Sequence, residues 1–167
     1  MENKSTCHQI CLLIFVGMLT AFWNSSSFAG EGPDFIGDKD QAVITNMKFA
    51  RDHITGAHLL DGSNVRPETA EELKNPVIPI EEGKRVVNRG ILTALAKYCG
   101  LDGQNDSYLP FMSHERQSKL WSDKQLAYIG LLHGITQAEF YDLFKKKGNC
   151  SDLQKQRVQT FLDNIDK

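Results

Sequence analysis

SDKQLAYIGLLHGITQAEFYDLFKKKG, residues 122–148, is the clearest helical pattern in the chain and decides its fold class. The pattern opens with Ser122-x-x-Gln125, a capping box in which each side chain satisfies a backbone donor that the first turn leaves unpaired. It ends at Gly148, after three lysines at residues 145–147. Because cations are favoured at the negative end of a helix dipole, the lysines need no binding partner to explain them. We therefore predict one long helix here.

Apolar residues recur at helical spacings on both sides of this stretch, and alternating strand patterns are almost absent. Gly100 follows one such segment at the position of a left-handed C-terminal cap. Ser151-x-x-Gln154 is a second capping box and opens a final helix. The expected helices cover residues 41–60, 81–98, 108–120, 122–147 and the segment from 151 onward. The sequence therefore predicts an all-α fold, a compact bundle of four to five helices.

The N-terminus has the features of a cleavable signal peptide. Lys4 provides a weakly positive start, and the apolar run from Ile10 to Trp23 follows it. A membrane-spanning helix needs roughly 20 apolar residues, so this run is short for an anchor and suits a signal peptide. Small residues at Ser27 and Ala29 favour cleavage after Ala29. We expect a signal peptide over residues 1–29, a flexible acidic lead-in over 30–40 and a single helical domain over 41–167.

The cysteines agree with export. Cleavage after Ala29 would leave only Cys99 and Cys150. In an oxidising compartment an even pair predicts one disulfide, here between the end of one helix and the start of the last. The two residues lie far apart in sequence and form no C-x-x-C, which disfavours a redox pair or a metal site. The predicted location is the periplasm or the outside of the cell, with no stable membrane anchor after cleavage.

Two glycines and a histidine make the central helix unusual. Gly130 and Gly134 each cost about 1 kcal/mol relative to alanine in a helix interior. With Ala138 they form a row of small residues, along which another backbone could approach closely. The helix at 81–98 offers a matching pair, Gly90 and Ala94. We predict that the two helices cross at short range through these residues.

His133 lies on the apolar stripe of the same helix. It is either a neutral, hydrogen-bonded core residue or a functional histidine at the floor of a groove, and a role in dimerisation is a third reading. His133 is the weak catalytic candidate. The weak binding candidates are Asn88, Thr93, Arg116, Tyr128, His133 and Gln137.

Recognised catalytic and cofactor motifs are missing from the sequence. There is no G-x-S-x-G, no phosphate-binding G-x-x-x-x-G-K-[ST] and no H-E-x-x-H. The histidines have no i, i+4 pair, so we expect no metal site and no cofactor. The formal net charge of −2 disfavours a nucleic-acid partner, which calls for a basic face.

Three functions stay open. The first is an exported, non-enzymatic protein that acts through a protein partner. The second is a small hydrolase or lyase that uses His133. The third is a small-molecule or metal carrier with a groove between helices.

Overall fold

The computed structural model describes residues 34–37 and 39–165 of the chain. The predicted signal peptide lies outside these residues. The described part contains five α-helices and no strand, so the predicted all-α class is confirmed. The α-helices are α2 (Asp40–Asp52), α3 (Ile80–Tyr98), α4 (Leu109–Ser118), α5 (Asp123–Lys145) and α6 (Asp152–Asn164). Two short 3-10 helices, η2 (Ile54–Gly56) and η3 (Glu72–Lys74), and a π-helical turn, η4 (Gln104–Tyr108), connect them.

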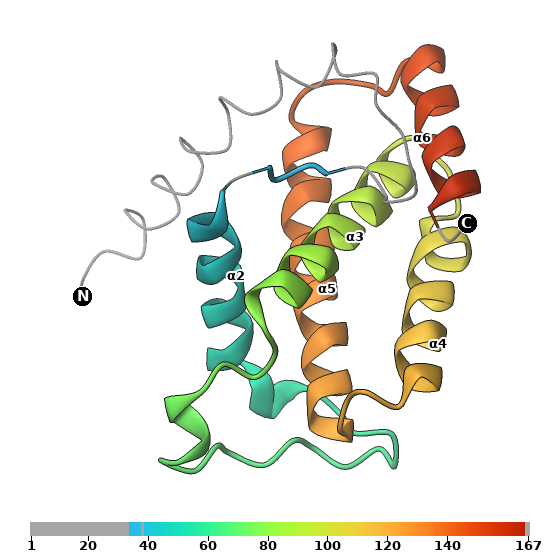
Figure 1. Ribbon diagram of the computed structural model, residues 1–167. Helices are drawn as coiled ribbons and strands as arrows, with labels where there is room; N and C mark the ends of the chain where they lie inside the picture. Colours follow the sequence, from blue (N-terminus) through green and yellow to red (C-terminus); the bar gives the residue numbers. More distant parts are fainter. Residues whose placement is uncertain (1–33, 38, 166–167) are drawn as a thin grey trace.

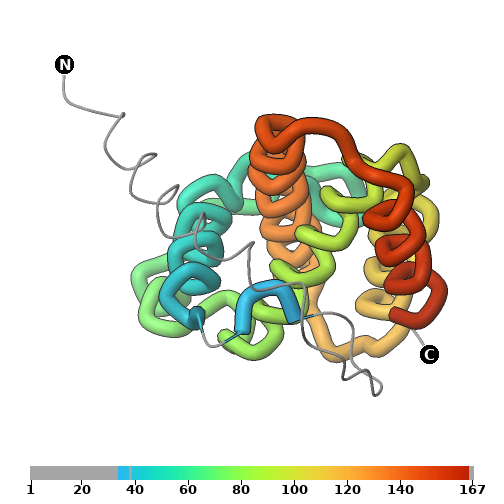
Figure 2. Tube along the Cα trace, turned by 90° about the horizontal axis from the view of Figure 1, so that it is seen from above, coloured from blue at the N-terminus to red at the C-terminus, as the bar shows by residue number. Residues whose placement is uncertain are grey.

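The helices are arranged around α3 and α5, which cross in the middle of the molecule (Figure 1). Helix α2 packs against both of them on one side, and α4 and α6 lie on the other side (Figure 2). Both predicted capping boxes form, with Ser122 at the start of α5 and Ser151 at the start of α6. Gly100 adopts a φ of 69° directly after α3 ends, as expected for a left-handed cap.

The predicted disulfide joins Cys99 to Cys150, with a Cα–Cα distance of 5.1 Å. It connects the end of α3 to the residue that precedes the cap of α6. A second link lies beside it, because the Tyr98 hydroxyl donates to the Gly148 carbonyl over 2.9 Å. These two contacts hold the C-terminal helix against the bundle.

Residues 34–37 belong to the segment expected to be a flexible acidic lead-in, and two of them pack into the core. Phe35 and Ile36 are buried, although they come before the first helix. The Phe35 backbone N–H donates to Asn88 Oδ1 over 2.9 Å, and the Phe35 ring meets Phe161 edge to face at 6.4 Å. Glycine, proline and acidic residues dominate the local composition, which gives no sign that two apolar side chains are buried here.

The close crossing of α3 and α5 involves Gly90, as predicted, but different residues of α5. A Cβ placed on Gly90 would lie 2.9 Å from Thr136 Cβ and 3.0 Å from the His133 carbonyl oxygen. The row Gly130, Gly134 and Ala138 is not the contact: Gly134 and Ala138 are exposed, and Gly130 faces Tyr108 and Met112. The apolar residues of α5 turn toward α3, so the small residues face away from it.

Two alanine substitutions should therefore have opposite effects on stability. Gly90→Ala should destabilise the fold by about 1–2 kcal/mol, because overpacking between two rigid helices outweighs the gain in helix propensity. Gly134→Ala should stabilise it by about 1 kcal/mol, because a Cβ there has no neighbour within 4 Å. Urea unfolding of the two variants measures both changes. Equal effects of the two substitutions would contradict the crossing described here.

Candidate functional site

His133 lies in the core between α5, α3 and η4, with no exposed surface. Its Nε2 is 3.1 Å from the Oγ1 atom of Thr93, one of the binding candidates named from the sequence. Thr93 has one hydroxyl hydrogen, and it donates over 2.9 Å to the Arg89 carbonyl, which can only accept. His133 Nε2 therefore donates to Thr93, and the buried Nδ1 is an acceptor without a hydrogen-bond partner among the described residues.

The surroundings of His133 favour the neutral imidazole. The Tyr108 and Phe111 rings have centroids 4.6 and 6.2 Å from that of His133. Burial lowers the pKa of His133 to about 3, and the positive charge of Arg89 contributes in the same direction. A general acid or base needs access to substrate. These contacts agree with the interpretation of His133 as a neutral core residue and argue against a catalytic role.

The other candidate residues lie in separate places. Asn88 anchors residues 34–35 through hydrogen bonds to Asp34 and the Phe35 backbone. Tyr128 is a core residue whose hydroxyl donates to the Met47 carbonyl over 2.7 Å, and burial raises its pKa. Gln137 lines a hollow beside the exposed Gly134. Of the predicted binding residues, only Arg116 borders the groove described next.

An open groove of about 240 Å³ lies where the loop after η2 meets η4, α4 and the first half of α5. Its floor is apolar, because Gly130 presents no side chain there and Met112 and Leu126 are buried beneath the surface. Leu60, with 60% of its surface exposed, stands at the edge. The lining residues are Ala57, His58, Leu60, Tyr108, Met112, Arg116, Asp123, Leu126, Ala127, Gly130 and Leu131.

Four polar side chains border this groove without being paired. Within the described chain, the side chains of His58, Tyr108, Arg116 and Asp123 form no hydrogen bond or ion pair. A guanidinium has five donors and a carboxylate two acceptor oxygens. The groove therefore combines an apolar floor with polar groups that are available to a bound molecule.

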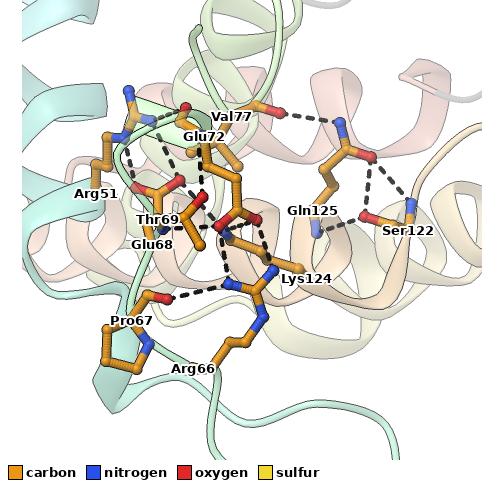
Figure 3. Close-up of polar contacts among 10 residues, drawn as sticks. All are labelled: Arg51, Arg66, Pro67, Glu68, Thr69, Glu72, Val77, Ser122, Lys124 and Gln125. Carbon is orange, nitrogen blue, oxygen red and sulfur yellow. Dashed lines mark hydrogen bonds and ion pairs between the residues drawn. The ribbon is translucent and has the colours of Figure 1, made fainter. Parts of the chain in front are cut away.

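An ion-pair network joins the segment around Glu68 and Glu72 to the start of α5 (Figure 3). Arg51 donates to both oxygens of Glu68, at 2.6 and 3.1 Å, and Lys124 contacts Glu68 at 3.2 Å and Glu72 at 3.0 Å. Arg66 binds both oxygens of Glu72 at 2.8 and 2.9 Å. These bonds lower the pKa of Glu68, through Arg51 first, and that of Glu72, through Arg66 first.

The network connects three parts of the chain, of which α5 lines the groove. Arg51 belongs to α2, Lys124 to α5, and the two glutamates to the segment around η3. Gln125 adds a hydrogen bond of 2.9 Å to the Val77 carbonyl. Because Glu68 is almost fully buried, its pairing matters more than that of an exposed ion pair. The chain that follows His58 and Leu60 is thus tied to α2 and α5 through Glu68 and Glu72.

The wall formed by α4 is fixed. Glu115 on α4 is buried, accepts a hydrogen bond of 2.7 Å from Trp121 Nε1 and pairs with Arg85 of α3 at 2.6 Å. The Arg85 guanidinium also lies 4.9 Å from the centroid of the Phe111 ring. These contacts hold the part of α4 that presents Arg116 to the groove.

A scan against protein-family models, a search of curated proteins and a search of solved structures each found no match to this chain. In the residues that the structure describes, no group of three or more His, Cys, Asp or Glu side chains could hold a metal ion. None of the described helices is long and apolar enough to cross a membrane.

The groove was not predicted from the sequence, although Arg116 and Gly130 were singled out there for other reasons. Its walls come from residues 57–60, 108–116 and 123–131, which no local pattern connects. One signal was present: Gly130 is a glycine in a helix interior, where it costs stability, and it lies one turn after the buried Leu126.

Proposed function

We propose that this chain is an exported, non-enzymatic protein that binds a protein partner through the groove between the loop after η2, α4 and α5. The supporting observation is the set of unpaired polar side chains around an apolar floor, on walls that are themselves held rigidly. Interfaces are enriched in Tyr, Met and Arg, and Tyr108, Met112 and Arg116 are the residues that η4 and α4 contribute here. A rigid site also lowers the entropy cost of binding.

Export of the mature chain to the periplasm or beyond the cell is part of this proposal. It rests on the N-terminal sequence pattern and on the disulfide, since Cys99 and Cys150 are the cysteines left after the predicted cleavage at Ala29. A net charge of −2 supports a protein partner over a nucleic acid.

The two other functions have less support. A hydrolase or lyase mechanism through His133 would need a substrate to reach a side chain with no exposed surface. A carrier needs an enclosing site, and sites for small molecules measure about 300–1,000 Å³. The open groove of about 240 Å³ is smaller than that and suits the side chain of a partner better.

The test compares capture of partner proteins from an extract of the exported fraction by the immobilised mature chain and two matched variants. Gly130→Met should fill the groove floor and lower the affinity for the captured partner roughly 30-fold, the loss typical of a blocked hot spot. Gly134→Met, on the same helix but facing open space, should leave binding unchanged. Melting temperatures of both variants control for folding.

Unchanged capture by Gly130→Met, with the fold intact, would show that the groove is not the binding surface. Equal losses in both methionine variants would point to a different face of α5.

A further inference from the structure

We propose that the groove receives an apolar side chain of the partner with a carboxylate beside it, so that the partner segment is apolar and singly acidic. This inference rests on the proposed function and adds the chemistry of the occupant. The apolar side chain lies on the floor formed by Met112, Leu126 and Leu131, and the carboxylate binds the Arg116 guanidinium.

The size and lining of the groove support the apolar anchor. At about 240 Å³ the groove holds a single large side chain, and single buried anchors provide most of the affinity in protein interfaces. Gly130 gives the floor its depth: a Cβ there would lie 3.5 Å from the Tyr108 hydroxyl and 3.8 Å from Met112 Cε. Met112 can adapt to the shape of the anchor, because an unbranched thioether side chain repacks readily.

The charges at the edge support the carboxylate. Arg116 is exposed and makes no ion pair among the described residues, and its planar guanidinium fits the two oxygens of a carboxylate. His58, which borders the same groove, can add a ring N–H donor. Interfaces enrich arginine and deplete aspartate, so Arg116 rather than Asp123 is the charge expected to take part.

Asp123 limits the number of acidic groups in the occupant. Its carboxylate borders the same groove and would repel a second acidic side chain there. A single carboxylate can pair with Arg116, whereas a strongly acidic segment would bring further carboxylates into a groove that already carries that of Asp123. Arg116 and Asp123 together therefore favour a partner segment with one negative charge over a segment with several.

Titration of the ¹⁵N-labelled mature chain with blocked dipeptides tests this chemistry directly. Acetyl-leucyl-glutamyl amide should shift the backbone amide signals of Ala127, Gly130 and Leu131, and it should bind about threefold to fivefold more tightly than acetyl-leucyl-lysyl amide, as one exposed ion pair allows. Acetyl-glycyl-glutamyl amide, which lacks the anchor, should cause no saturable shift.

Two variants separate the anchor from the charge. Arg116→Glu should reverse the preference, so that the lysyl peptide binds more tightly than the glutamyl one. Gly130→Met should abolish the shifts with every peptide, whereas Gly134→Met should preserve them. Both comparisons use variants whose spectra remain those of the folded chain.

Equal binding of the glutamyl and lysyl peptides, no groove shifts with either, or shifts confined to residues around Gly134 would overturn the inference. If the peptides fail but Gly130→Met still abolishes capture of the partner, the groove is a binding site for a different chemistry, and only this inference falls. If capture is also unaffected, the proposed function falls with it.

Discussion

Acidification from pH 6.5 to pH 5 should reduce the free energy of unfolding by roughly 2 kcal/mol through His133 alone, and by roughly 4 kcal/mol as the pH approaches 3. The folded-state pKa of His133 is about 3, against 6.5 for a free histidine. Between these values the unfolded chain binds a proton that the folded chain does not. Stability is therefore complete above pH 6.5 and falls by up to 1.36 kcal/mol for each pH unit below it.

The structural cause is the closed environment of the imidazole. A protonated ring would need a partner for its Nδ1–H, and the buried Nδ1 has none among the described residues. Arg89 would add like-charge repulsion. Ion pairs lower the pKa of carboxylates such as Glu68. The contribution of such a carboxylate to the free energy of unfolding is therefore lost only as the pH falls below about 4.5. The window from pH 6.5 to 5 therefore reports on His133.

Urea unfolding at pH 7, 6 and 5 measures this dependence. His133→Gln, which cannot be protonated in this range, should be less stable at pH 7 but should lose the slope. His58→Gln, at an exposed position, should keep it. The same slope in the wild-type chain and in His133→Gln would show that His133 is not the group that titrates.

Loss of the Cys99–Cys150 disulfide should cost about 4 kcal/mol of stability. The bond closes a loop with a sequence separation of 51 residues, and the chain-entropy model gives this value for that length. Helix α6 depends on the bond most directly, because Cys150 lies just before its cap and because Val158 and Leu162 are its only buried apolar residues in the described range. Reduction should therefore loosen α6 first.

Two measurements check this expectation. Denaturant unfolding of the oxidised chain, the reduced chain and the Cys99→Ala/Cys150→Ala double variant should give the loss of stability. Hydrogen exchange should become faster in α6 and stay unchanged in the middle of α5. A loss below about 1 kcal/mol, or equal acceleration in every helix, would contradict the role given to the disulfide.

The helices could be predicted because their causes are local. The capping boxes at Ser122 and Ser151, the glycine after α3 and the apolar spacing of three and four act within a few residues of one another. The disulfide could be predicted by counting, since only two cysteines follow the expected cleavage site. Hydrogen bonds between near neighbours and the number of cysteines can both be read without knowledge of the tertiary structure.

The site could not be predicted because its causes are long-range. The sequence shows that Gly130 and Gly134 are small residues in a helix. Only the packing of Gly90 against Thr136 shows that α3 contacts a different face of α5. Phe35 is buried because Asn88 and Phe161, distant in sequence, lie beside it.

The sequence by itself determined the all-α class of this protein, the capped starts of α5 and α6, the end of α3 and the disulfide, but not the end of α2, which stops at Asp52 within the helix expected over 41–60. The tertiary structure alone decided which helix faces are covered, how the loop after η2 is held by Glu68 and Glu72, and where the groove lies. The physical reason is that hydrogen bonds within a helix form between near neighbours, whereas a groove exists only after distant segments have packed together.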